Sequence, residues 1–194
     1  MAKPSQPARP SQGHLRIIAG EWRSRRLPVP VGEGLRPTPD RVRETLFNWL
    51  APHIEGAHVL DAFTGSGALY LEALSRGAAE AVALDSNPAA IANLRENLEL
   101  LRCPRGKVIQ NDALRYLQGE VKQQFDLVFL DPPFHQDLLA TTCGLLEDRG
   151  WLRESAWIYT ESEAAPSSLQ MPGSWRLHRE KKTGQVHYAL WQRG

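Results

Sequence analysis

Short apolar runs alternate with longer segments of helical spacing through the middle of this chain, and this rhythm constrains the fold more than any other feature. Four runs, at 57–61, 80–85, 107–110 and 125–130, have the length and composition of strands buried on both faces. The segments between them place leucines at helical spacing. This alternation predicts an α/β fold, in which helices cover both faces of a mostly parallel sheet.

The segments on either side of this core complete the predicted architecture. Downstream, 156–161 is a fifth predicted strand, and 175–179 and 185–191 form a predicted antiparallel pair that closes the sheet. Upstream, a helix is predicted to begin at Pro39 with Thr38 as its cap, because a proline is favoured at the first helical position.

The residues before this helix are expected to form a basic β-hairpin. Two short runs, 15–19 and 22–27, flank a Gly-Glu pair that suits a turn. A chain of 194 residues is long enough for one domain with a substantial core. We therefore expect a flexible tail over 1–13 and a single domain over 14–194, in which 14–36 is the hairpin extension.

Cations gather near the N-terminus although the whole chain is close to neutral. Residues 1–50 hold nine Lys/Arg and four Asp/Glu, a net of +5, and residues 51–194 hold fourteen and eighteen, a net of −4, which together give the overall +1. A basic segment on an acidic body is typical of a protein with a polyanionic partner, and the planar fork of arginine suits phosphate. The basic run 179–182 is a secondary candidate, for which solvated surface charge is an equally good explanation. The N-terminal candidates for nucleic-acid contact are Arg16, Arg23, Arg25, Arg26 and Arg36.

The tetrapeptide Asp131-Pro132-Pro133-Phe134 follows the predicted strand at 125–130 and carries the clearest chemistry. Prolines fix φ and donate no N–H, so this turn is stiff and its carbonyls are free to accept hydrogen bonds. The carboxylate and a carbonyl could each accept one hydrogen of an amine, and the ring could stack on a flat substrate. A rigid strand-to-helix turn with an ordinary Asp cap explains the residues equally well.

A glycine loop, Asp61 to Gly67, follows the first strand of the core, and Asp85 ends the next strand. Glycines let a backbone approach a ligand closely, and an acid about 20 residues further on meets ribose hydroxyls in nucleotide folds. A dinucleotide fingerprint would require a glycine where Tyr70 stands. An acid at the start of the loop also suits a cation better than a pyrophosphate. The loop therefore favours S-adenosylmethionine over NAD, the alternative being a βα turn with an Asp cap.

Asp112 follows the third predicted strand, so it is expected at the ligand-facing edge of the sheet. Its carboxylate could accept from an adenine amine, or it could cap the helix that follows. The sequence leaves these two readings open.

Cysteine content and apolar runs restrict the compartment. Cys103 and Cys143 belong to no metal-binding or disulfide pattern, so we expect no metal and two buried thiols. The start of the chain is polar and proline-rich, without the apolar stretch of a secretory signal, and no run is long enough to span a bilayer. These features predict a soluble, cytoplasmic protein without a membrane partner.

The motifs LDAFTGSG, ALDSN, NDA and DPPF, in this order, resemble those of class I S-adenosylmethionine-dependent amino-methyltransferases. The blocks RIIAGEWRSRRLPVP, LRPTPDRVRETLFNWL, LEALSRGA, LLEDRGWL and LHREKKTGQV more specifically resemble the RsmD-type methyltransferases, which modify guanine N2 in bacterial 16S ribosomal RNA. The likeness extends from about Arg16 to Trp191. It implies a Rossmann-like fold with a mostly parallel seven-stranded sheet and an antiparallel last strand. Tyr70 stands where a small residue is expected, so local helix packing is expected to differ.

The resemblance also implies an activity and a set of residue roles. The expected reaction transfers a methyl group from S-adenosylmethionine to N2 of a guanine in 16S rRNA, guanine 966, leaving S-adenosylhomocysteine. The expected substrate is a partly assembled small ribosomal subunit, and the enzyme is expected to be a monomer. Alternatives are an amino-methyltransferase of DNA adenine or cytosine and a non-catalytic RNA-binding module. The implied cofactor contacts are Asp61, Phe63, Gly65, Gly67, Asp85, Ser86, Asp112 and Ala113, and the implied catalytic pocket is Asp131, Pro132, Pro133 and Phe134.

Overall fold

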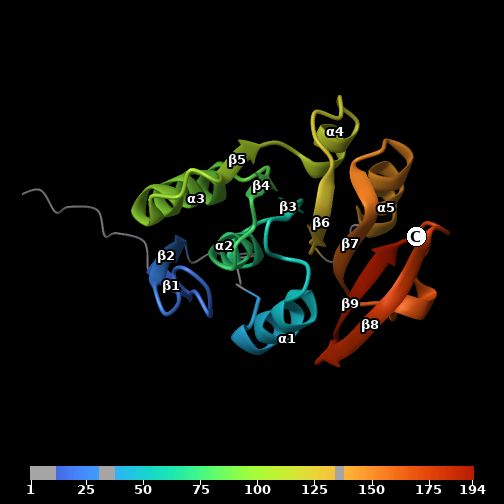
Figure 1. Cartoon of the computed structure of the whole chain (residues 1–194), viewed down its shortest axis with the longest axis horizontal. Coiled ribbons are helices and arrows are strands. Elements are labelled where there is room, and N and C mark those ends of the chain that lie inside the picture. Colours follow the sequence, from blue (N-terminus) through green and yellow to red (C-terminus); the bar gives the residue numbers. More distant parts are fainter. Residues whose placement is uncertain (1–11, 31–37, 134–137) are drawn as a thin grey trace, which may run out of the picture.

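A seven-stranded sheet with the order β5-β4-β3-β6-β7-β9-β8 forms the centre of the molecule (Figure 1). The structure, a computed structural model, describes residues 12–30, 38–133 and 138–194. The strands are β3 (His58–Asp61), β4 (Glu80–Asp85), β5 (Gly106–Gln110), β6 (Phe125–Leu130), β7 (Leu152–Ser162), β8 (Trp175–Thr183) and β9 (Val186–Arg193).

Strand direction in this sheet agrees with the sequence prediction. β3, β4, β5, β6 and β7 are parallel to one another, whereas β9 is antiparallel to both β7 and β8. The last strand of the chain is therefore the antiparallel one. The predicted strand at 156–161 is longer than expected and begins at Leu152, with a register irregularity between Phe125 and Leu127 of its neighbour.

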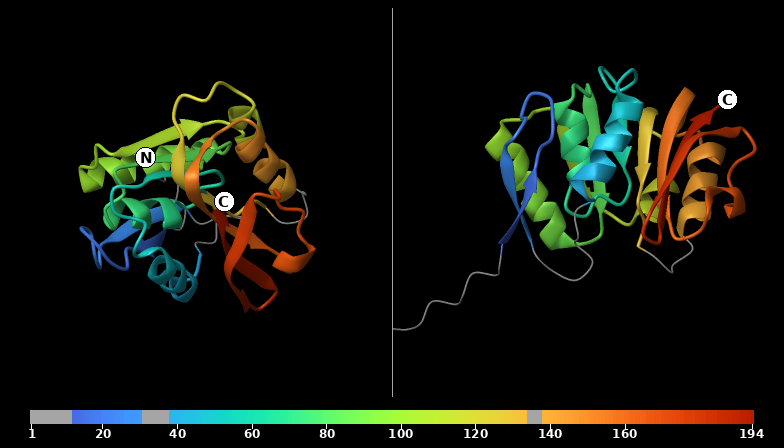
Figure 2. Two further views of the ribbon diagram at one scale, coloured as in Figure 1. Left: turned by 45° about the vertical axis from the view of Figure 1, so that its right-hand side comes forward. Right: turned by 90° about the horizontal axis from the view of Figure 1, so that it is seen from below.

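Helices cover both faces of the sheet, as Figure 2 shows from two directions. Successive strand residues face opposite ways, so Leu127 and Phe129 pack into one core cluster, and Val128 and Leu130 pack into the other. The first cluster includes α1 (Asp40–Leu50), α2 (Ala68–Ser75) and α3 (Pro88–Leu101), and the second includes α4 (Ala113–Leu117) and α5 (Leu138–Asp148). Within the described residues, no helix has the length and apolar character that crossing a membrane requires.

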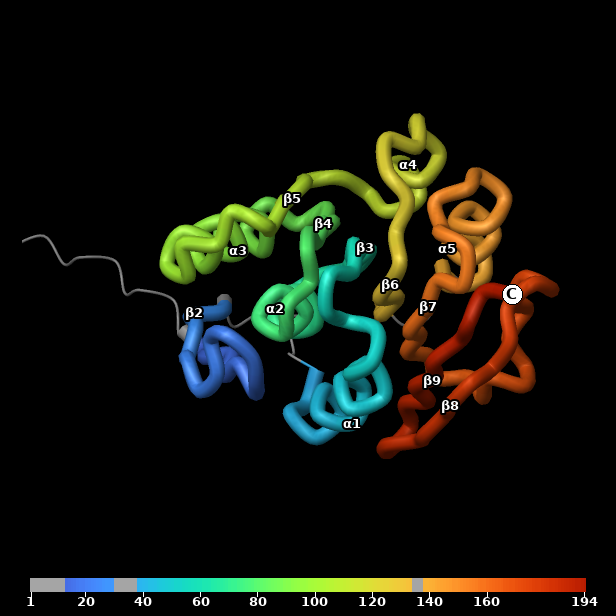
Figure 3. The backbone as a smooth tube through the Cα atoms, viewed as in Figure 1, coloured from blue at the N-terminus to red at the C-terminus, as the bar shows by residue number. Residues whose placement is uncertain are grey.

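The path of the chain reverses between β3 and β6, which can be followed along the tube in Figure 3. From β3 the chain moves outward to β4 and β5, then returns to place β6 on the other side of β3. Ligands of open α/β sheets bind beyond the carboxyl ends of the strands at such a switch point. The ends of β3 and β6 carry Asp61 and Asp131, so the topology brings the two predicted motifs together.

The N-terminal hairpin exists, but its strands are not the predicted ones. β1 (Gln12–Arg16) and β2 (Arg26–Pro30) pair antiparallel, and 17–25 forms a wide loop in place of a tight turn at Gly20. The loop is wide because four of its amides, those of Ile18, Ala19, Glu21 and Trp22, donate to α2. The amide of Glu21 donates to the carbonyl of Ser75 at 2.7 Å, and the amide of Trp22 donates to the Ser75 hydroxyl at 3.0 Å.

Glu72 fastens this loop to the body of the protein. It is fully buried in α2, and its two carboxylate oxygens accept from the amides of Ile18 at 2.9 Å and Ala19 at 3.0 Å. Arg76 pairs with the same carboxylate at 2.7 Å, and buried Arg43 of α1 approaches it at 3.4 Å. One carboxylate thus joins the hairpin, α1 and α2.

Helix α1 begins one residue later than predicted, and Thr38 does not cap it. The capping position is Pro39, which provides no side-chain hydrogen bond. Asp40, in the first turn, instead pairs with Arg43 at 2.6 Å and with Arg16 of β1 at 2.8 Å. The acid therefore links the helix to the hairpin while it lies near the positive end of the helix dipole.

Candidate active site

The glycine loop after β3 holds an open backbone site beside Asp85. Gly65 has a φ of +51°, and a side chain there would meet open space. Its amide donates to one oxygen of the Asp85 carboxylate at 2.9 Å, while the amide of Asn87 donates to the other at 2.8 Å. The Asp85 carboxylate is thereby held between the two βα turns. This arrangement leaves the loop backbone accessible to a ligand next to a fixed acid.

Gly67 has a different role from Gly65. Its φ is +79° and it caps α2, which runs from Ala68 with every residue buried. A Cβ at Gly67 would stand 2.2 Å from the Cδ2 atom of Leu94 in α3. Glycine at this position therefore permits α2 and α3 to pack closely behind the loop.

Asp61 ends β3 as a buried acid, only 2% exposed. The pKa of its carboxyl group is raised to about 7, mainly by burial. The Thr64 hydroxyl, which donates to this carboxylate at 3.1 Å, lowers the pKa, whereas the negative charge of Asp85 raises it. A cation bound next to Asp61 would favour the charged carboxylate. The site therefore suits the positively charged amino-acid end of a ligand.

The remaining predicted cofactor residues lie at the same edge of the sheet with different exposure. Phe63 is half-buried against the α4 and α5 core, and Ser86 is exposed beyond β4. Asp112 caps α4, since its carboxylate accepts from the amide of Arg115 at 2.9 Å, while Ala113 is buried. The capping interpretation of Asp112 is thus confirmed, and its adenine contact stays a prediction.

Asp131 begins the second motif directly after β6. Pro132 is buried, Pro133 is exposed and Asp131 lies between these extremes. Burial raises the pKa of the Asp131 carboxyl group well above its usual range, and the charges of Glu161 and Asp61 add to the effect. The fourth residue of the motif, Phe134, lies outside the described residues.

Sequence reasoning missed a third acid at this edge, Glu161 near the end of β7. It is 8% exposed, and the hydroxyl of buried Tyr159 donates to its Oε1 atom at 2.8 Å. Burial raises the pKa of Glu161, while the Tyr159 hydrogen bond opposes the rise. The available signal was an acid at the end of the predicted strand 156–161.

The described RNA-binding candidates lie on the hairpin strands and on the 17–25 loop. Arg16 pairs with Asp40, and Arg26 lies opposite Arg16 in the hairpin. Arg23 and Arg25 belong to the 17–25 loop, which docks at the end of α2 and so lies towards the amino ends of the parallel strands. Arg25 donates there to the carbonyl of Leu100, at the end of α3, at 3.2 Å. Arg36 lies outside the described residues.

Lys181 and Lys182 of β8, in contrast, lie at the carboxyl edge of the sheet. Ladder pairing places Lys181 opposite Tyr188 of β9, which itself pairs with Glu161, and Lys182 and Ser162 both pair with His187. From Arg176 to Thr183, β8 is exposed, because it is the outermost strand of the sheet. The tip of the β8–β9 hairpin thus places two lysines near the acidic site.

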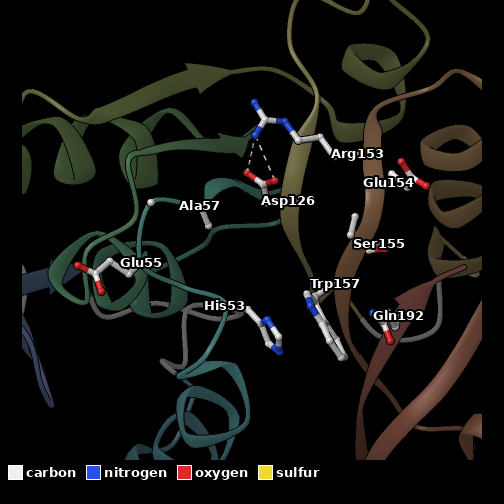
Figure 4. Close-up of a pocket in the computed structure, with 11 residues that line it drawn as sticks. His53, Glu55, Ala57, Asp126, Arg153, Glu154, Ser155, Trp157 and Gln192 are labelled. Atoms are coloured by element: carbon white, nitrogen blue, oxygen red, sulfur yellow. Dashed lines mark hydrogen bonds and ion pairs between the residues drawn. The ribbon is translucent and has the colours of Figure 1, made fainter.

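A cavity of about 370 Å³ lies at the opposite end of β6 and β7 and contains none of the predicted site residues (Figure 4). Arg153 pairs across it with Asp126 at 3.1 Å, and His53 stacks on Trp157 with ring centroids 4.5 Å apart. The charged groups and the aromatic rings in these two contacts are thus paired with other residues of the protein. Neither the glycine loop nor Asp131 contributes to the cavity.

Tyr70 shows how this chain accommodates the residue that departs from the expected pattern. Its ring is fully buried, and its hydroxyl donates to the carbonyl of Lys107 at 3.3 Å. Gly106 provides the space, because a Cβ there would stand 2.4 Å from the Tyr70 hydroxyl oxygen. The tyrosine packs away from the ligand loop, against β5.

Comparison with known proteins agrees with this geometry. The chain is 50% identical to the Ribosomal RNA small subunit methyltransferase D of Escherichia coli (strain K12), over 97% of this chain and 94% of that protein. A solved structure described as a putative methyltransferase yhhF from Escherichia coli superposes with a TM-score of 0.86 and 51% identity, covering 93% of this chain and 98% of that one.

The fold also matches a more distant enzyme, the Thermus thermophilus 16S rRNA N2 G1207 methyltransferase in complex with AdoMet and guanosine. The TM-score is 0.70 at 20% identity, over 98% of this chain and 52% of that one, which shows the shared class I methyltransferase fold. The family model described as "Conserved hypothetical protein 95" matches residues 15–192. The chain belongs to this family, the RsmD-type methyltransferases.

Proposed function

We propose that this protein transfers a methyl group from S-adenosylmethionine to the exocyclic N2 atom of a guanine in 16S rRNA, guanine 966 by resemblance, during small-subunit assembly. The relationship to a curated small-subunit rRNA methyltransferase supports methylation of rRNA. The observation that carries the proposal is that the glycine loop and Asp131 follow the paired strands β3 and β6 at the switch point. A methyl donor and an amine acceptor bound at these motifs would be neighbours.

The residues at the end of β3 and β4 fit S-adenosylmethionine, which supplies a methyl group on a sulfonium. Asp61 would face the amino-acid end, where a positive charge lowers the cost of a buried carboxylate. Gly65 offers an open backbone, and Asp85, already fixed by two amides, would accept from the ribose hydroxyls. Phe63 supplies apolar surface beside the loop.

The Asp131 motif would prepare the nitrogen for attack. The amine of guanine is a poor nucleophile because its lone pair is delocalised into the ring. If Asp131 and a carbonyl of Pro132 or Pro133 each accept one N–H, the nitrogen can become pyramidal with its lone pair directed at the methyl group. Positioning of this kind contributes up to ~7–11 kcal/mol in intramolecular reactions. Asp131 then takes the proton that the methylated, cationic nitrogen loses.

The target base must leave its stack to reach this pocket. Phe134 would replace the lost stacking, an interaction typically worth about 1–3 kcal/mol per base. RNA phosphates next to the extruded base would meet the β8–β9 hairpin tip, because Lys181 and Lys182 lie in the same ladder rows as Glu161 and Ser162. The N-terminal arginines Arg16 and Arg26 would contact RNA further from the pocket.

A transfer assay tests this proposal. The protein is incubated with methyl-labelled S-adenosylmethionine and either naked 16S rRNA or partly assembled small subunits. We expect label in the assembly intermediate, and we expect Asp131→Ala to abolish transfer while S-adenosylhomocysteine binding stays near the wild-type level. Label in DNA, or in neither RNA sample although the cofactor product binds, would contradict the assignment.

A further inference from the structure

Glu161 is a buried acid at the proposed pocket that has no role in the reaction described so far. It points to the same face of the sheet as Tyr159, two residues earlier, and that tyrosine packs with Phe129 in the core under α1 and α2. Thr160, between them, faces the other way, and its hydroxyl accepts from the indole of Trp191 at 3.0 Å. The contacts of Tyr159 and Thr160 therefore fix the face of the sheet on which Glu161 lies.

The sheet register brings Glu161 next to Asp131. β6 and β7 are parallel, with Phe129 opposite Tyr159 and Leu130 opposite Thr160. The following residues of the two strands are Asp131 and Glu161, and both lie on the face of Phe129 and Tyr159. Two carboxyl groups thus adjoin each other in a partly dehydrated site.

Few described groups can compensate the charge of this pair. The charges that act on the Asp131 carboxyl group are those of Glu161 and Asp61, which are both acids. Glu161 accepts a hydrogen bond from the Tyr159 hydroxyl, and Tyr188 lies opposite Glu161 on β9. The nearest cation in the ladder, Lys181, is on the next strand and exposed.

We propose that Glu161 is a positioning residue that controls whether Asp131 is ionised, and so sets the pH above which Asp131 can take the proton of the methylated amine. The inference rests on the proposed function, in which Asp131 takes that proton, because only the ionised carboxylate has a free site for it. The Tyr159 hydrogen bond favours charge on Glu161, and a charge there opposes ionisation of the neighbouring Asp131. Two adjacent carboxyl groups of this kind lose their protons in two coupled steps.

The proposal assigns a direction to each variant. Glu161→Gln keeps an oxygen that can accept from Tyr159 but removes the charge next to Asp131, so Asp131 should ionise at lower pH. Tyr159→Phe removes the hydrogen bond that stabilises the charged form of Glu161, so it should act in the same direction. Glu154→Gln is the matched control, because Glu154 is exposed on the same strand at the opposite edge of the sheet.

The pH dependence of kcat/KM for methyl transfer to small-subunit particles is the first readout. We expect the acid limb to move by about one pH unit to lower pH in Glu161→Gln, to move the same way in Tyr159→Phe, and to stay in place in Glu154→Gln. A lower rate with an unmoved acid limb in both pocket variants would show a merely structural role and overturn the proposal.

Carbon-13 NMR titration of the Asp131 carboxyl group in the free protein is the second readout, and it does not depend on the substrate. Its midpoint should fall in Glu161→Gln and Tyr159→Phe relative to the wild type. An unchanged Asp131 midpoint would show that Glu161 does not control the ionisation of Asp131, even if the enzyme methylates RNA. If the wild type transfers no methyl group, the proposed function fails, and the NMR titration still decides whether the two acids are coupled. S-adenosylhomocysteine binding identifies any variant that has lost its fold.

Discussion

Asp61 is a buried acid whose ionisation should be visible in the stability of the unliganded protein. Its pKa is about 7 in the folded protein against an ordinary 3.8, so between these values the folded chain holds a proton that the unfolded chain has released. Stability therefore falls as pH rises through this window, by up to about 4 kcal/mol for this group. Denaturant unfolding should show the wild type less stable at pH 8 than at pH 5.5. Asp61→Asn should reduce that difference and Glu154→Gln should not; an equal loss in all three proteins would contradict the raised pKa.

Alanine substitutions at the two glycines of the glycine loop should change stability and ligand binding to different extents. Gly67→Ala adds a Cβ next to Leu94 at a positive φ, so we expect it to lower the free energy of unfolding by about 2–4 kcal/mol. Gly65→Ala meets open space and should cost about 1 kcal/mol, but it should weaken S-adenosylhomocysteine binding by tenfold or more because its methyl group lies where the ligand approaches. Urea unfolding and calorimetric binding measure the two effects. Equal stability losses would show that Leu94 does not restrict the loop.

Among the elements, the hairpin depends on α2 for its position. Glu72→Ala would leave the amides of Ile18 and Ala19 without their acceptor and remove a carboxylate from buried Arg43. We expect the variant to lose about 3–5 kcal/mol of stability. Hydrogen exchange should rise first in 17–25, before the sheet, because the amides of this loop depend on α2. Uniform acceleration across the chain would show that the hairpin is not separately anchored.

The β8–β9 hairpin and the 17–25 loop offer a direct comparison of two basic elements. Neutralising Lys181 and Lys182 to glutamine should weaken binding to small-subunit RNA and lower the slope of log affinity against log salt by about 1–2. The matched double change Arg23→Gln and Arg25→Gln should have the smaller effect, because these residues lie towards the other edge of the sheet. Binding measured over a salt series decides between them, and the reverse ranking would place the RNA along the N-terminal loop.

Across the whole molecule, the sequence predicts the parts that local patterns determine. The apolar run Phe125–Leu130 forms β6, and Asp112 caps α4, one of the two roles that the sequence left open. The 17–25 loop was predicted wrongly because its amides bind Glu72 and Ser75, more than fifty positions away. Glu161 was missed for a similar reason, since only the register of β6 with β7 places it next to Asp131. Local periodicity carries no information on such long-range pairs.

We propose that the Asp131 pocket, next to the glycine loop, methylates the exocyclic amine of a guanine in small-subunit rRNA. The most direct test is mass spectrometry of nucleosides from small-subunit particles that have reacted with methyl-labelled S-adenosylmethionine and the purified protein. The proposal predicts labelled N2-methylguanosine with the wild type and none with Asp131→Ala. Label on another base or another atom of guanine, or an undiminished yield with Asp131→Ala, would contradict it.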